Sequence, residues 1–231
     1  MRNSRLAQNL VKSMRRTITR IFIATVLALV ALPVLSFAKS KTLDSFVTKV
    51  STSLVSFDYS FSMPTKKAKL TGNGSVMVQG NSFVMNGNGL EIWCDGKTRW
   101  TIDRLSEEAL IEYVDDSYES FATNPALMIA SVDDAFREVS FSSTKFEGKV
   151  VDASDLSPLH KGKGSMDISS LMLYFKSGSS DLVGARVTLN DGSVSDFSIT
   201  NLKFEKSDKS KESFRFNEKT LGASYVITDL R

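Results

Sequence analysis

The sequence predicts a mainly β protein with a few helices, in which a single curved antiparallel sheet forms an unclosed β-barrel capped by amphipathic helices. Short runs rich in β-branched and aromatic residues recur along the chain, separated by Gly, Asn and Asp, as in an antiparallel meander. Only two segments have the apolar period of a surface helix. Two helices are too few to cover a flat sheet of this width, so we expect the sheet to curve around them.

The first 38 residues are predicted to be a secretory signal peptide. Residues 2–20 contain six basic residues and no acidic one, and residues 21–35 form an apolar run. This run is shorter than the about 20 residues of a membrane-spanning helix. Ser36 and Ala38 are the small residues that a signal peptidase requires. We therefore expect cleavage between Ala38 and Lys39, with an uncleaved N-terminal anchor as the alternative.

The predicted cleavage changes the charge of the chain. It removes six basic residues and no acidic one, which turns the formal net charge from +3 to −3. A protein that binds nucleic acid needs a basic face for the phosphates, so no nucleic-acid partner is expected. Residues 39–231 have the length of a single domain, and we expect a monomer. One cysteine cannot form an internal disulfide.

The first element of the remaining chain is a predicted amphipathic helix at residues 41–53. Its apolar stripe is formed by Leu43, Phe46, Val47 and Val50. The apolar period then changes to two over residues 55–63, which predicts a strand with one apolar and one polar face. Further strands are predicted near residues 68–78, 82–85, 90–94, 98–103 and 109–114.

A second amphipathic helix is predicted to interrupt the strands from Asn124 onward. Asn124 suits the N-cap and Pro125 suits the first helical position. The apolar stripe of this helix is formed by Met128, Val132, Ala135, Phe136 and Val139. Strands are predicted to resume near residues 142–151, 165–176, 182–189, 194–205, 213–216 and 225–229.

The stretch LEIWCDGKTRW, residues 90–100, predicts a hairpin with a two-residue turn at Asp95-Gly96. This turn pairs Cys94 with Lys97 and Trp93 with Thr98. The alternation of side chains then places Trp93, Trp100 and Ile102 on one face of the hairpin. The other face carries Leu90, Ile92, Cys94 and Arg99.

Cys94 has two interpretations. A buried strand residue is favoured, because free cysteine is among the most buried residue types. The alternative is a reactive thiol whose pKa is lowered by Lys97. The only histidine is His160, and nothing in the sequence connects it to Cys94.

No motif supports catalysis, and we expect no enzymatic activity, metal or cofactor. Adjacent carboxylates occur at residues 107–108, 115–116 and 133–134. Neighbouring acids in a strand or helix point in different directions and are usually solvated. His160 alone makes neither a catalytic triad nor a zinc site.

The apolar face of the predicted sheet is the remaining candidate site. A curved sheet with bulky residues on one face can enclose a space wider than its side chains fill. The alternative is the ordinary core of a β protein. The candidate lining residues are Val55, Phe57, Tyr59, Phe61, Met63, Phe83, Met85, Trp93, Trp100, Met128, Val132 and Phe136.

The order of several motifs resembles the outer-membrane lipoprotein carrier (LolA) family. These motifs are GNGSVMV at 72–78, FVM at 83–85, CDGKTRW at 94–100, NPALMIA at 124–130, FRF at 214–216, Gly222 and VITD at 226–229. The family has a signal peptide followed by an amphipathic helix, and the resemblance covers the whole chain after residue 38. Where many members carry Lys-Arg-Pro after the first of these strands, this chain has Gln79-Gly80-Asn81.

The resemblance implies a LolA/LolB-like half-barrel and a periplasmic carrier. Members take acylated lipoproteins from an inner-membrane ABC transporter and pass them to an outer-membrane receptor. The twelve candidate lining residues would then shield the acyl chains of the cargo, without a cofactor. The alternative function is a lipid-sensing or scaffold protein of the cell envelope that has the same half-barrel and transports nothing.

Overall fold

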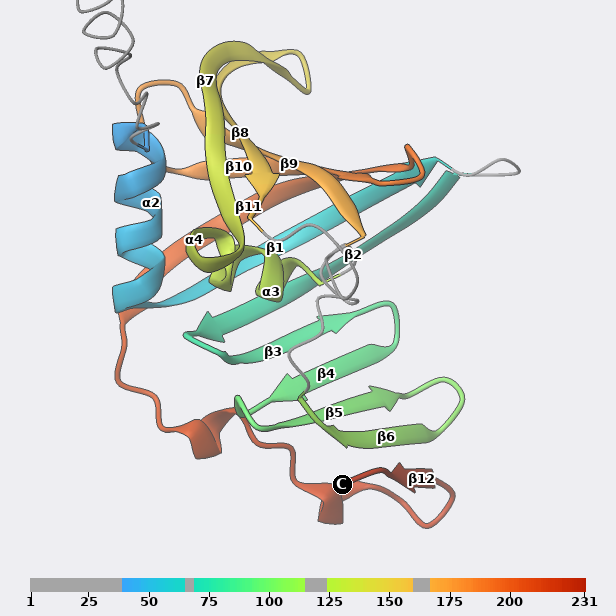
Figure 1. The fold of residues 1–231 in the computed structure, drawn as a ribbon. Coiled ribbons are helices and arrows are strands. Elements are labelled where there is room, and N and C mark those ends of the chain that lie inside the picture. Colours follow the sequence, from blue (N-terminus) through green and yellow to red (C-terminus); the bar gives the residue numbers. More distant parts are fainter. Residues whose placement is uncertain (1–38, 65–68, 115–123, 160–166) are drawn as a thin grey trace, which may run out of the picture. The chain divides into compact units, whose positions relative to one another are not determined.

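The structure is a computed structural model that describes residues 39–64, 69–114, 124–159 and 167–231. The predicted signal peptide and His160 lie outside the described residues. Figure 1 shows how the described helices and strands are arranged. In chain order they are α2 (Lys41–Thr52), β1 (Ser53–Pro64), β2 (Lys69–Gln79), β3 (Ser82–Gly87), β4 (Leu90–Cys94), β5 (Thr98–Asp103), β6 (Glu108–Tyr113), α3 (Pro125–Ala130), α4 (Val132–Ala135), β7 (Phe136–Phe146), β8 (Lys149–Pro158), β9 (Ile168–Lys176), β10 (Leu182–Leu189), β11 (Val194–Lys206), η1 (Lys211–Phe214), η2 (Glu218–Thr220) and β12 (Val226–Asp229).

The twelve strands form one sheet in the order β12-β6-β5-β4-β3-β2-β1-β11-β10-β9-β8-β7. Neighbouring strands are antiparallel, except that β12 pairs with β6 in parallel. The sheet curves around α2, α3 and α4, and its two edge strands, β12 and β7, lie far apart in Figure 1. The predicted fold class, a curved and unclosed sheet capped by helices, is confirmed.

We call the face of the sheet that the helices cover the inner face, and the opposite one the outer face. The inner face carries the largest apolar cluster, the inner cluster, to which α2, α3, α4, β1–β4 and β7–β11 contribute. The outer face of β1–β6 carries two smaller clusters that include side chains from residues 211–225. The sheet is therefore apolar on both faces over part of its width.

Helix α2 forms where the apolar period predicts it. Ser40 is the N-cap, and its hydroxyl accepts a hydrogen bond from the backbone N–H of Leu43 at 3.2 Å. Leu43, Phe46 and Val50 are buried on one side of the helix. The chain becomes extended at Ser53 and continues directly into β1, so the helix is joined to a central strand without a loop.

Glycines in β2 allow the aromatic side chains of β1 to lie flat on the inner face. Tyr59 pairs with Gly74 in the sheet. A Cβ atom at Gly74 would lie 2.7 Å from the Tyr59 hydroxyl and 2.0 Å from the Asn86 carbonyl oxygen. Only glycine leaves room for these neighbours, which explains the second glycine of the GNGSVMV motif.

The second predicted helix is shorter than its apolar stripe suggests. The Asn124 side chain caps it as predicted, accepting hydrogen bonds from the N–H groups of Ala126 and Leu127. The helical region ends at Ala135, however, and Phe136 begins β7, so the prediction of helix to Val139 is wrong. Strand pairing with β8 from Phe136 onward replaces helical hydrogen bonds there.

The strand prediction at residues 142–151 is also wrong. It runs across the turn between β7 and β8, where Glu147 and Gly148 have φ angles of 49° and 77°. These left-handed angles reverse the chain. The predicted strand at residues 213–216 is absent as well, because η1 occupies Lys211–Phe214.

The hairpin of β4 and β5 has a different register from the predicted one. The Asp95 carboxylate accepts hydrogen bonds from the N–H groups of Lys97 and Thr98 at 2.9 and 2.8 Å. This moves the turn to Gly96-Lys97, so Cys94 pairs with Arg99 and Trp93 pairs with Trp100. The pairing shifts by two residues, which keeps each side chain on its predicted face of the hairpin.

Candidate apolar binding face

The inner cluster contains eight of the twelve candidate residues. Val55, Phe57 and Tyr59 come from β1, Phe83 and Met85 from β3, Met128 from α3, Val132 from α4, and Phe136 from the start of β7. Phe61 packs against the cluster and is partly buried. Met63, farther along β1, is partly exposed and is not among the side chains of the cluster.

Trp93 and Trp100 do not lie on the inner face, so their prediction as lining residues beside Phe83 is wrong. Phe83 pairs with Cys94, whereas Trp93 pairs with Val84. Paired side chains share a face and successive ones alternate, so both tryptophans lie on the outer face. Asn88-Gly89 between β3 and β4, with φ angles of 53° and 84°, is the signal that specifies this register.

The second half of the inner cluster comes from strands outside the predicted site. Phe46 of α2 packs edge-on against Phe175 of β9, with ring centroids 5.4 Å apart, and against Phe204 of β11 at 6.4 Å. Apolar residues alternate along these strands, and this pattern in the sequence could have identified them as part of the site. Their buried side chains on this face include Leu156, Leu171, Leu173, Phe175, Val187 and Phe197.

The helices cover the inner face closely. In α3 and α4, the side chains of Ala126, Met128, Ile129, Val132 and Ala135 are 0–3% exposed. Helices of six and four residues are too short to be stable alone, so packing on the sheet holds them in place. Among the described residues, α3 and α4 therefore bury the part of the inner face that lies beneath them.

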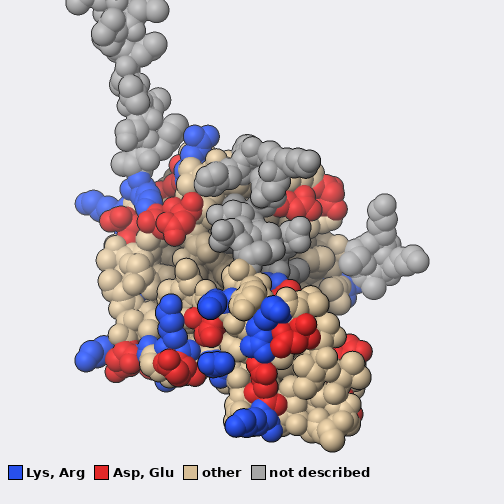
Figure 2. All heavy atoms as spheres, turned by 60° about the horizontal axis from the view of Figure 1, so that its bottom comes forward, with Lys and Arg blue, Asp and Glu red and all other residues tan. Residues whose placement is uncertain are grey.

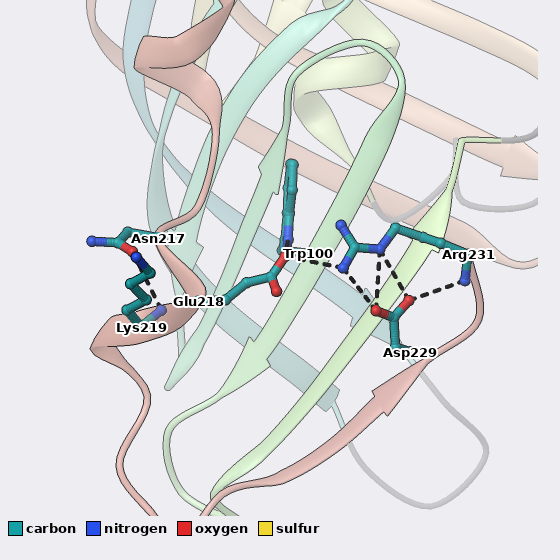
Figure 3. A network of polar contacts seen from close by, with 6 residues as sticks. All are labelled: Trp100, Asn217, Glu218, Lys219, Asp229 and Arg231. Carbon is teal, nitrogen blue, oxygen red and sulfur yellow. Dashed lines mark hydrogen bonds and ion pairs between the residues drawn. The ribbon is translucent and has the colours of Figure 1, made fainter.

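The outer face of β3–β6 is closed by the C-terminal segment. Trp100 is fully buried beneath it, and its indole N–H donates a hydrogen bond to the Glu218 carboxylate at 2.8 Å. Arg231 lies 3.2 Å from the same carboxylate and also pairs with Asp229, whose pKa it lowers to about 2. Figure 3 shows this network joining β5, η2 and β12. The tryptophans are structural anchors of this segment.

Cys94 is a buried residue of the inner cluster. Burial raises the pKa of its thiol, the opposite of what a reactive cysteine needs. The sulfur accepts a hydrogen bond from the Gly96 N–H at 3.4 Å and donates one to the Asn81 carbonyl oxygen at 3.6 Å. The structure therefore supports the interpretation of Cys94 as a buried strand residue.

We expect Cys94→Ser to fold normally and to lower the free energy of unfolding by about 1 kcal/mol. A serine hydroxyl can make the same two hydrogen bonds, but it is less favourable next to apolar neighbours. Urea unfolding of the two proteins measures the difference. Loss of apolar-ligand binding by a folded Cys94→Ser protein would instead assign the thiol a direct role.

Titratable groups outside the inner face are mostly solvated or paired. Asp133 forms an ion pair with Lys39, and residues 115–116 lie outside the described part of the chain. Within the described residues, no group of three or more His, Cys, Asp or Glu side chains could hold a metal ion. Lys, Arg, Asp and Glu side chains are interspersed on the face that Figure 2 shows.

The structure thus defines a class of protein: an open, curved sheet whose apolar inner face is covered by short helices. No helix in the described ranges is long and apolar enough to cross a membrane. No protein-family model matches the chain, and no curated protein matches it.

Several solved structures are similar to the chain. An uncharacterized conserved protein from Thermus thermophilus shares 11% identity, with a TM-score of 0.48 over 82% of this chain and 97% of that one. A LolA superfamily protein from Nitrosomonas europaea shares 12% identity, with a TM-score of 0.45 over 77% and 99%. A putative outer membrane lipoprotein-sorting protein domain from Vibrio parahaemolyticus shares 9% identity, with a TM-score of 0.42 over 74% and 94%.

Proposed function

We propose that this protein is a periplasmic carrier that shields the acyl chains of lipoproteins on its inner face during transfer from the inner to the outer membrane. The observation that carries the proposal is the inner cluster, an apolar layer that runs across β1–β4 and β7–β11 and is covered by three separate short helices. Two of these helices, α3 and α4, are too short to be stable alone. A carrier needs a large apolar face that can open and close.

The energetics of acyl transfer agree with such a site. A chain of about 16 carbons loses roughly 12 kcal/mol on moving from a membrane into water, at about 0.8 kcal/mol per methylene. A carrier offsets most of this cost by burying the chain. The Phe and Met side chains of the inner cluster suit variable acyl shapes, since methionine is flexible and polarizable.

The partners and the location follow from the same proposal. The cargo is an acylated lipoprotein, delivered by an inner-membrane ABC transporter and passed to an outer-membrane receptor, as the sequence resemblance implies. Cleavage after Ala38 releases the chain from the inner membrane, so that it can move between the inner and the outer membrane. The inner cluster belongs to residues 43–199, so cleavage leaves the site intact.

A second candidate is an envelope lipid sensor or scaffold that uses the same half-barrel without transporting cargo. The close packing of the inner face favours it, because Val55, Phe57 and Met128 are at most 2% exposed. In this function the inner face stays shut, and partners bind elsewhere on the surface.

The test is to purify the mature protein from its native envelope and to identify bound lipids and acylated proteins by mass spectrometry. The carrier function predicts acylated proteins in stoichiometric amounts. The purified protein should have the mass of a chain that begins at Lys39. Fluorescent fatty-acid and lipopeptide titrations of the purified protein measure the affinity directly. Absence of bound acyl groups in both experiments would leave the sensor or scaffold function.

A further inference from the structure

The two residues in front of α2 are bound by carboxylates that lie 94 and 98 residues later in the chain. The Ser40 hydroxyl donates a hydrogen bond to Glu138 at 2.9 Å, and the Ser40 backbone N–H donates one to the other oxygen of the same carboxylate. Lys39 forms an ion pair with Asp133 of α4. The start of α2 is thereby joined to α4 and to the beginning of β7.

Glu138 occupies a position where the sheet pattern favours an apolar residue. It is 7% exposed, it pairs with the buried Leu156 in β8, and it lies two residues after Phe136 on the inner face. A carboxylate buried at such a position is costly unless hydrogen bonds compensate for the lost water. The two hydrogen bonds from Ser40 supply this compensation.

The contact ties α2 to both the centre and the edge of the sheet. The C-terminal end of α2 continues directly into β1 in the middle of the strand order, whereas β7 is the last strand. Between these ends, Phe46 packs against Phe175 of β9. Figure 1 shows α2 standing beside α4 and β7 on the inner face. Glu138 thus fixes the end of α2 that β1 does not hold.

We propose that Glu138 is a latch that keeps the helical cover closed over the acyl site. The inference rests on the proposed function and names a positioning residue for that site. When the N-terminal end of α2 moves away, water takes over the hydrogen bonds to the carboxylate, so opening exposes no unpaired buried charge.

The first test compares Glu138→Gln and Ser40→Ala with the native protein by hydrogen exchange. Glutamine cannot accept both hydrogen bonds as the carboxylate does, because its amide has one oxygen and a donor NH₂ group. Hydrogen bonds to charged groups contribute about 1.5–3 kcal/mol, so the amides of α2 should exchange about tenfold faster or more. The β1–β11 amides should be unchanged. The matched control is Asp196→Asn, which breaks an ion pair with Arg186 on the outer face of β10 and β11.

The second test measures the association rate of a fluorescent fatty acid with the same four proteins. Both latch variants should bind the probe severalfold faster, and Asp196→Asn should bind it at the native rate. Unchanged exchange of α2 in both variants overturns the latch. Faster exchange with an unchanged association rate overturns its control of the acyl site. If no protein binds the probe, the proposed function fails, and hydrogen exchange still decides whether Glu138 holds α2.

A reversible cross-link tests whether this end of α2 controls access, because the same protein is compared before and after cleavage of the linker. In a Cys94→Ser background, Ser40→Cys and Glu138→Cys place two thiols at the latch, which a short cleavable bismaleimide can join. The cross-linked protein should take up the probe at least tenfold more slowly, and cleavage of the linker should restore the rate. Equal rates before and after cleavage would show that this end of α2 does not control access.

Discussion

Trp100→Ala should lower the free energy of unfolding by about 3–5 kcal/mol, as expected for truncation of a fully buried aromatic residue. The indole is 0% exposed and packs with Ile102, Ile111 and Phe216 beneath the C-terminal segment. Its loss leaves a cavity and removes the N–H donor of Glu218. Because Trp100 lies on the outer face, the protein that remains folded should bind acyl probes with native affinity. Urea unfolding and probe titration on the same sample measure both quantities.

Trp100→Phe is the matched control for this substitution. It keeps an aromatic ring and removes the hydrogen bond to Glu218, so we expect a smaller loss of about 1–3 kcal/mol. A large loss of probe affinity in either folded variant would place Trp100 in the binding site and contradict the strand register.

Phe57→Ala should have the second large effect, on stability and binding together. Phe57 is 2% exposed in the inner cluster, so truncation should cost about 3–5 kcal/mol of unfolding free energy. The same substitution removes part of the apolar surface that the proposed function assigns to acyl chains. We therefore expect weaker binding of a fluorescent fatty acid by the folded protein, measured below the start of its unfolding transition.

Met77→Ala provides the control on the other side of the sheet. Met77 pairs with Ser56 and packs with Val84 and Phe214 on the outer face. It should lower stability and leave probe affinity unchanged. If Phe57→Ala and Met77→Ala alter binding equally, the effect reflects general destabilisation, and the inner face has no special role in binding.

The local sequence patterns predict most of the elements of this fold. Residues 41–53 and 55–63 show the change of apolar period that separates α2 from β1, and the strands at 90–94, 98–103 and 182–189 are predicted at their observed bounds. These segments are predictable because side-chain alternation and capping act over a few residues. Five of the twelve candidate residues, Val55, Phe57, Tyr59, Phe83 and Met85, follow the same alternation onto the inner face.

The tertiary structure alone decides what covers each face. The sequence predicts which side chains of the β4–β5 hairpin share a face, but the pairing of β4 with β3 determines which of the two faces is the inner one. Helix propensity continues past Ala135, and pairing with β8 ends it at Phe136. No local pattern marks Glu138, because its hydrogen-bond partner Ser40 lies 98 residues away in the sequence. These features depend on contacts between distant segments, whose free energies exceed the local preferences that a sequence pattern expresses.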